Sequence, residues 1–273
     1  MFNIRKMLVM GTFGFASGLP YILIFSTLSA WLRDVGISLS LIGFFSWIAL
    51  TYSLKFLWAP FVDRFSVPIL NRYGRRKSWI ILTQLIIVFC IFTLSSINPI
   101  DSLSFFIFIA FLIAFSGSIQ DIAIDAFRIE YADISDQGNL AAAYQFGYRL
   151  AILAATSLAL ILADNYGWST SYEVMGLLML TGLIGVVISK KENINTQLEI
   201  LNFKDSFIKP IKDFGSRYGF YLASLLLLIV ATYRLTDIVM GPMANPFYLD
   251  MGYSLTEIGS VVKIVALIAS VIG

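Results

Sequence analysis

Residues 36–43 read GISLSLIG and residues 252–259 read GYSLTEIG, and each octapeptide stands at the start of a long apolar run. At a constant offset of 216 residues, five of the eight positions are identical, and Ser40 is matched by Thr256. The first octapeptide leads into the second apolar run of the chain and the second leads into the eighth. This register indicates a duplication of a six-helix unit. The predicted fold class is therefore all-α, a polytopic helical membrane bundle.

The apolar runs have the length of membrane-spanning helices, which need about 20 mostly apolar residues each. They lie near residues 7–32, 39–60, 78–97, 103–127, 140–163, 173–189 and 218–243, and an eighth begins near residue 255. The 273 residues are 58% hydrophobic and 13% charged, which is too apolar for one soluble core. We expect a bundle of about eight helices in a lipid bilayer, with the chain stopping inside the eighth.

Basic residues predict the orientation of the bundle. Alternate loops, beginning with the N-terminus, hold 14 lysines and arginines, whereas the opposite loops hold Arg33 alone. By the positive-inside rule, the N-terminus and the polar stretch 190–217 are cytoplasmic. That stretch predicts the domain organisation: a six-helix unit over 1–189, a linker over 190–217, and the start of a second unit over 218–273. The net charge of +2 gives no indication of nucleic acid as a partner.

The rarer residue types limit the chemistry. The chain has no histidine and one cysteine, Cys90, inside an apolar run. Imidazole proton relays and most metal sites are thereby excluded, and Cys90 is expected to be a buried thiol. No cluster of a nucleophile and a base stands out, so we predict neither an enzyme nor a cofactor. Any coupling to protons would have to use carboxylates.

A charged motif follows the second apolar run. Asp63-Arg64 comes first, and Gly74-Arg75-Arg76-Lys77 opens the third run. The pair resembles the loop motif D-R-x-G-R-R of the major facilitator superfamily, with residues 65–73 inserted between its parts. One interpretation is that the arginines serve only as positive-inside charges. The other is a charge-assisted cluster that latches the helix ends in one conformation. The latch would consist of Asp63, Arg64, Arg75 and Arg76.

Four further stretches narrow the resemblance: FGFASGLP at 13–20, IGFFS at 42–46, KFLWAPFVDR at 55–64 and SIQDIAIDA at 118–126. Together they resemble AmpG-type muropeptide permeases, a branch of the major facilitator superfamily that also includes acetyl-coenzyme-A transporters. The resemblance implies proton-coupled import of anhydro-muropeptides across the inner membrane for peptidoglycan recycling. That family usually continues for four or more further helices. A non-transporting sensor or an inactive remnant is therefore the alternative, and acetyl-coenzyme A or another anionic solute is the alternative substrate. The oligomeric state stays open.

Charged residues inside the apolar runs are the candidate site, because a charge at the bilayer centre costs at least about 2.5 kcal/mol. Asp121 and Asp125 are four residues apart and share one helix face, so their repulsion favours proton uptake by one of them. The alternative is that Asp125 pairs with Arg128 or a loop arginine. Arg149 lies deep in the fifth helix, where it would neutralise these aspartates or bind an anionic substrate. The proton-coupling candidates are Asp121, Asp125 and Asp237, and the substrate-binding candidates are Arg149, Gln120, Arg234 and Lys263.

Overall fold

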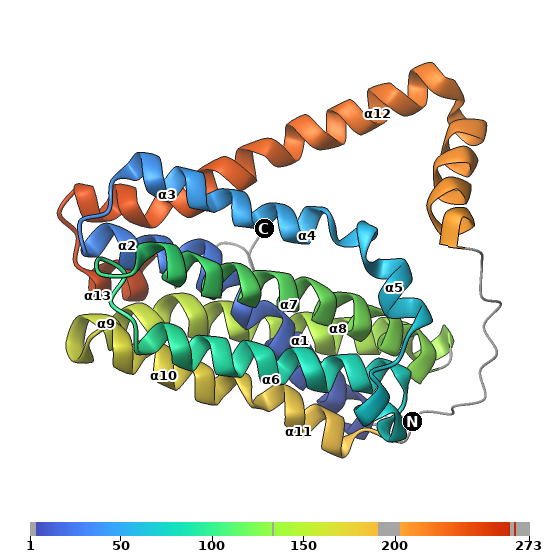
Figure 1. Cartoon of the computed structure of the whole chain (residues 1–273), viewed down its shortest axis with the longest axis horizontal. Helices are drawn as coiled ribbons and strands as arrows, with labels where there is room; N and C mark the ends of the chain where they lie inside the picture. The colour runs from blue at the N-terminus through green and yellow to red at the C-terminus, as the bar shows by residue number, and fades with distance from the viewer. Residues whose placement is uncertain (1–3, 133, 191–202, 263–264, 266–273) are drawn as a thin grey trace.

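The computed structural model describes residues 4–132, 134–190, 203–262 and 265, and within these residues it contains helices and no strands (Figure 1). Most of the helices lie roughly along one axis, whereas α12 runs obliquely to the others. In chain order they are α1 (Ile4–Ile22), the π-helix η1 (Leu23–Thr27), α2 (Leu28–Asp34), α3 (Leu39–Phe45), η2 (Ser46–Ala49), α4 (Leu50–Ser53), η3 (Lys55–Leu57), α5 (Ala59–Arg64), η4 (Pro68–Tyr73), α6 (Arg75–Ser95), α7 (Leu103–Tyr131), η5 (Ile134–Asp136), α8 (Gln137–Leu153), η6 (Ala154–Leu158), α9 (Ala159–Tyr166), α10 (Trp168–Met179), α11 (Thr181–Ile188), α12 (Phe203–Asp250), α13 (Leu255–Glu257) and η7 (Ile258–Val262).

These elements join into seven stretches long and apolar enough to cross a membrane within the described residues. The first six follow the predicted apolar runs in order, which confirms a polytopic helical membrane protein. The stretches are Ile4–Asp34, Leu39–Leu57, Arg75–Ser95, Leu103–Tyr131, Ile134–Tyr166, Trp168–Ile188 and Ile208–Tyr233.

The seventh helix differs from the prediction of 218–243. The ribbon α12 begins at Phe203, inside the predicted linker, and ends at Asp250. Gly219 breaks it with φ 73° and ψ 157°, a left-handed φ that a residue without a Cβ adopts readily. The helix also continues past Pro242 and Pro246, since neighbouring groups in a membrane bundle can satisfy the carbonyls that proline leaves free. Residues 191–202 of the linker lie outside the described part, so the division into two units stays a prediction.

The predicted duplication has a counterpart in the backbone of two turns. Gly36 and Gly252 both have φ +89°, and Ser38 and Ser254 both cap the following helix through their side chains. The amide of Gly36 donates to the carbonyl of Arg33 at 2.9 Å, and the amide of Gly252 donates to that of Leu249 at 2.9 Å. Three further hydrogen bonds from backbone amides to carbonyls repeat at the same offset. In the first turn they run from Val35 to Trp31, from Ile37 to Leu32 and from Ile42 to Ser38. In the second turn they run from Met251 to Phe247, from Tyr253 to Tyr248 and from Ile258 to Ser254.

Small residues bring α1 and α8 into backbone contact. A Cβ at Gly14 would collide with the carbonyl of Tyr144, and one at Gly147 would collide with that of Gly11. Gly18 lies against the ring of Tyr148, where a Cβ would be 3.0 Å from the ring edge. Spacing by three and four residues places these glycines on one face, as expected for close packing in a membrane. Residues of α1 and α8 that bear functional groups are therefore held in a fixed register.

The bundle has two chemically distinct ends. The ends of α5 and α11 and the start of α8 lie at one end, and the turns before α3, α7, α10 and α13 lie at the other (Figure 1). We call these the basic end and the acidic end, after the residues of their loops. The helices α3 to α5 and α12 lie along one side of the bundle. Many of their side chains are exposed, including Phe44, Trp47 and Tyr221.

Candidate functional site

Asp121 lies on α7 at the interface with α1 and α8. Its carboxylate accepts a hydrogen bond from the hydroxyl of Ser17 on α1. Ser17 in turn accepts a hydrogen bond of 2.7 Å from the phenol of Tyr144 on α8. Three helices thus contribute to one chain of polar groups, Tyr144 to Ser17 to Asp121. The chain exists because glycines bring α1 within hydrogen-bonding reach of its neighbours.

Asp125, one turn further along α7, has different neighbours. The Nζ of Lys55 and a guanidinium nitrogen of Arg128 each lie 3.9 Å from its carboxylate oxygens. The side chain of Asp125 is 47% exposed, so these are loose ion pairs. The guanidinium of Arg128 also lies 5.9 Å from the ring of Tyr144. The predicted alternative for Asp125, pairing with Arg128, is therefore present, and Lys55 is a second partner.

Gln120 holds α7 against α1. Its side chain is 0% exposed, and its amide donates to the carbonyl of Ala16 at 2.9 Å. This carbonyl lacks its helical donor because residue 20, four positions later, is proline and has no N–H. The amide of Gln120 thus replaces the hydrogen bond that Pro20 removes. In this conformation Gln120 has a structural role, and its contact with a substrate stays a prediction.

Aromatic residues complete the wall beside Asp121. The hydroxyl of Tyr52 on α4 lies against Gly117, where a Cβ would collide with it. The ring of Tyr52 contacts Tyr21 at 4.9 Å and Phe25 at 5.8 Å between centroids. Within the described residues this buried hydroxyl has no hydrogen-bond partner. The surroundings of Asp121 thus combine hydroxyl groups and aromatic rings.

The remaining predicted site residues are described to different extents. Arg149 lies on α8 and is half-buried. Arg234 and Asp237 lie in the helical ribbon α12, but their side chains are outside the described part. Lys263 lies outside the described residues altogether. The roles of these four residues stay predictions.

The charged motif at the basic end forms a cluster centred on Arg76. Its guanidinium binds Asp63 at 2.5 Å and Glu130 at 3.0 and 2.8 Å. Arg75 adds a longer contact of 3.4 Å to Glu130. Arg64 lies apart, with its guanidinium 5.8 Å from the ring of Phe65, and no ion pair among the described residues includes it. The cluster joins the end of α5 to the ends of α6 and α7, and its role as a latch stays a prediction.

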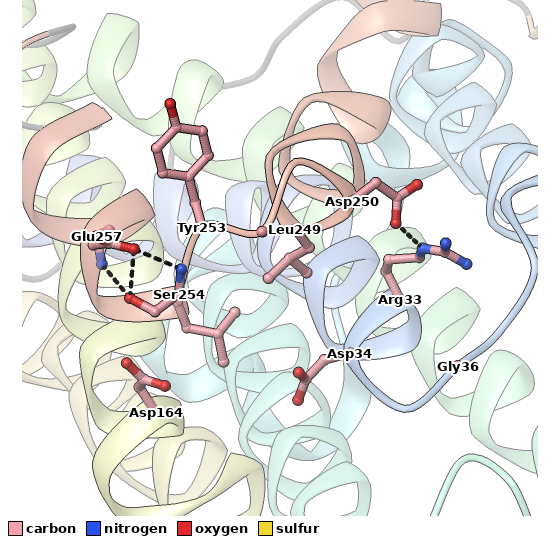
Figure 2. A pocket seen from close by; sticks show the side chains of 11 residues that line it. Arg33, Asp34, Gly36, Asp164, Leu249, Asp250, Tyr253, Ser254 and Glu257 are labelled. Carbon is pink, nitrogen blue, oxygen red and sulfur yellow. Dashed lines mark hydrogen bonds and ion pairs between the residues drawn. The ribbon is translucent and has the colours of Figure 1, made fainter.

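An open pocket of about 550 Å³ lies at the acidic end, between the two repeated turns and the end of α9 (Figure 2). Arg33 binds Asp250 at 2.6 Å across this pocket. The carboxylate of Asp164 accepts a hydrogen bond of 3.0 Å from the amide of Thr256. Asp34 accepts a hydrogen bond of 2.8 Å from the indole of Trp168. Each of these carboxylates therefore has a protein partner.

Two kinds of residue were missed by sequence reasoning. Ser17 and Tyr144 carry no charge, so a search for intramembrane charges passes over them, although Ser17 lies in the quoted stretch FGFASGLP. Glu130 lies at a helix end, where a carboxylate ordinarily faces water. Among the described residues, no three side chains of the His, Cys, Asp and Glu types are grouped as a metal site requires.

Comparison with known proteins places these features in a family context. The family model described as Major Facilitator Superfamily matches residues 5–273. The chain is 36% identical over 266 residues to "Putative transporter AmpG 4" of Rickettsia conorii, an alignment that covers 95% of this chain and 64% of that protein. It is 34% identical over 262 residues to the "Anhydromuropeptide permease" of Escherichia coli K12, covering 95% of this chain and 52% of the permease. The chain thus spans between half and two thirds of the length of these relatives.

Proposed function

Because the chain belongs to the major facilitator superfamily, we propose that it acts in transport, as the first part of a carrier that imports anhydro-muropeptides together with protons. Relatives that bear the names of transporters and of an anhydromuropeptide permease support the solute class. The basic residues of alternate loops support an inner-membrane location with the basic end in the cytoplasm. Import would then deliver cell-wall fragments to the cytoplasm for peptidoglycan recycling.

The observation that supports coupling to protons is the contrast between the two aspartates of α7. The carboxylate of Asp125 makes two ion pairs of 3.9 Å, one with Lys55 and one with Arg128. Asp121 accepts a hydrogen bond from a neutral hydroxyl, and no ion pair among the described residues includes it. A protonated Asp121 can keep this contact, because the serine hydroxyl can accept as well as donate. We therefore assign the transported proton to Asp121 and an ion-pairing role to Asp125.

The solute would bind through groups that match its own. Anhydro-muropeptides carry carboxylates on their peptide part and hydroxyls on their sugars. The guanidinium of Arg149 is always charged and binds carboxylates in a bidentate manner. The aromatic faces and the phenol of Tyr52 offer stacking surfaces and a hydrogen bond for the sugar part. Arg149 and Tyr52 are thus the residues of the first unit to which we assign solute binding.

Uptake of labelled anhydro-muropeptide into membrane vesicles that contain the protein tests this function. A pH gradient, acid outside, should drive accumulation by the unaltered chain. Asp121→Asn should abolish accumulation yet preserve exchange of labelled for unlabelled solute, since exchange requires no net movement of protons. Asp125→Asn should retain dependence on the gradient. Asp213→Asn, which removes an exposed charge from α12, is the matched control and should behave as the unaltered chain.

Two results would contradict the proposal. Accumulation at the unaltered level by Asp121→Asn would remove Asp121 from proton coupling. If the unaltered protein were present in the membrane at normal abundance but showed neither uptake nor exchange, the chain on its own would not transport this solute.

A further inference from the structure

Contacts between the first six spans and the α12–α13 segment gather at the acidic end. Arg33 of α2 binds Asp250 of α12 at 2.6 Å, and Asp164 of α9 accepts from the amide of Thr256 in α13 at 3.0 Å. One turn deeper, the amide of Asn245 donates to the carbonyl of Ser26 at 2.7 Å and to its hydroxyl at 3.1 Å. Asn245 is 1% exposed, so this contact seals the region beneath the ion pair.

Toward the basic end, α12 leaves the bundle (Figure 1). Phe220, Tyr221 and Tyr233 are 90%, 80% and 79% exposed, so this stretch of α12 packs little against the six spans. The same helix is therefore attached at one end and separated at the other.

The repeated turn explains why Arg33 reaches Asp250. Asp34 and Asp250 occupy equivalent positions in the two copies of the turn, at the offset of 216 residues. Asp34 is bound within its own unit by Trp168. Asp250, its equivalent, is bound by Arg33 from the other copy, as Figure 2 shows. The ion pair thus joins the two copies, whereas the contact of Asp34 stabilises one of them.

We propose that Arg33–Asp250 and Asp164–Thr256 form the outer gate of the carrier, closed in this conformation and broken when the site opens toward the acidic end. The assignment rests on the proposed transport function for its purpose, but its geometry stands apart from the solute. The side chains of Arg33 and Asp250 are 30% and 35% exposed. Water can replace such a pair at little cost, and opening must in addition break the buried hydrogen bonds from Asn245 to Ser26.

A single introduced cysteine can report on the gate. Ser29 on α2 is 5% exposed and lines a small cavity between α2, α3 and α12, behind the ion pair. Ser29→Cys in a Cys90→Ser background should react slowly with a membrane-impermeant maleimide added to right-side-out vesicles. Its rate reports the fraction of molecules that are open outward. Replacing Arg33 by Ala or Asp250 by Asn should raise the rate about twofold to fivefold, the range of a partly exposed ion pair.

Exchange of the two charges provides the decisive variant. The double variant Arg33→Asp with Asp250→Arg rebuilds the pair in reverse and should return labelling of the introduced thiol to its slow rate. Asp164→Ala should raise the rate independently, and Asp213→Asn, which removes an exposed pair within α12, should leave it unchanged.

The outcomes separate the gate from the transport function. Unchanged labelling in both single variants, or fast labelling that persists in the exchanged double variant, would refute the gate whatever the uptake. Faster labelling in the single variants and slow labelling in the exchanged variant would support the gate even if no muropeptide uptake were found. In that case the proposed solute would be wrong and the gate would stand.

Discussion

Replacement of Arg76 tests whether the charged motif at the basic end is a single cluster. The guanidinium is 4% exposed and makes three hydrogen bonds to the carboxylates of Asp63 and Glu130. Arg76→Met keeps the length and apolar stem of the side chain and removes its charge. Arg75→Met is the matched control, because Arg75 is the adjacent residue in sequence but makes one contact of 3.4 Å to Glu130.

The expected magnitude follows from the contacts and from exposure. Hydrogen bonds to charged groups contribute about 1.5–3 kcal/mol each, and breaking a fully buried ion pair costs about 3–5 kcal/mol. The carboxylates left behind are 53% and 30% exposed and regain water. We therefore expect Arg76→Met to lower the free energy of unfolding by about 2–3 kcal/mol. Arg75→Met should lower it by at most about 1 kcal/mol, as for a surface pair.

Unfolding of both variants in mixed micelles with a rising fraction of SDS, followed by tryptophan fluorescence, measures the difference. Equal losses for Arg75→Met and Arg76→Met would refute the reasoning, because they would mean that general positive charge matters and the paired geometry does not. A loss below about 0.5 kcal/mol for Arg76→Met would do the same, as it would fall in the range of ordinary surface substitutions.

Three other predictions concern the helix interfaces. Gly14→Ala should lower the free energy of unfolding by about 1–3 kcal/mol in the same micelle assay, because the added Cβ would collide with the backbone of α8. Gly11→Ala is the control and should change the free energy of unfolding far less, because its Cβ would lie 3.7 Å from the nearest atom, the carbonyl oxygen of Ala143. Gln120→Leu should lower the free energy of unfolding by about 1–3 kcal/mol, because it leaves the buried carbonyl of Ala16 without a donor. Adding Pro20→Ala should recover much of this loss, because residue 20 then has a backbone N–H. If the double variant were as unstable as Gln120→Leu alone, the hydrogen bond from Gln120 to Ala16 would not have the proposed role. Arg149→Ala should reduce uptake about tenfold or more, equivalent to about 1.4 kcal/mol. Arg149→Lys should retain more uptake, since lysine keeps the charge but lacks the planar guanidinium. If both variants took up solute as fast as the unaltered chain, Arg149 would have no role in solute binding.

The helices and their order could be predicted from the sequence because lipid imposes a simple rule on length and apolarity. The prediction that the thiol of Cys90 is buried is confirmed. The predicted start of the seventh run at residue 218 agrees with the break at Gly219, but the polar helix before it, from Phe203, could not be predicted in the same way because it lies outside the apolar run.

The site was harder to predict than the spans, since it depends on how helices are rotated against one another. Periodicity correctly placed Asp121 and Asp125 on one face of α7, but it could not tell which neighbours that face would meet. Ser17 and Tyr144 lie 104 and 127 residues from their partners in sequence. The hydrogen bond from Gln120 to Ala16 could not be predicted from the sequence. Its prediction requires knowing that α7 crosses α1 at the carbonyl that Pro20 leaves without a donor.

The contacts of this bundle differ in how deeply they are buried, and this difference limits which helices can move against one another. Two contacts within the first six spans, the glycine packing of α1 on α8 and the hydrogen bond from Gln120 to Ala16, are buried. A dry hydrogen bond is costly to break because its groups would face hydrocarbon, so these spans should move together. Of the contacts that join these spans to α12, the ion pair of Arg33 with Asp250 is partly open to water and can exchange its partner for solvent, whereas the hydrogen bonds from Asn245 to Ser26 are buried. Motion between the six spans and α12 must therefore break the buried hydrogen bonds of Asn245 as well as the outer ion pair, while Ser17, Asp121 and Tyr144, which all belong to the six spans, keep their contacts.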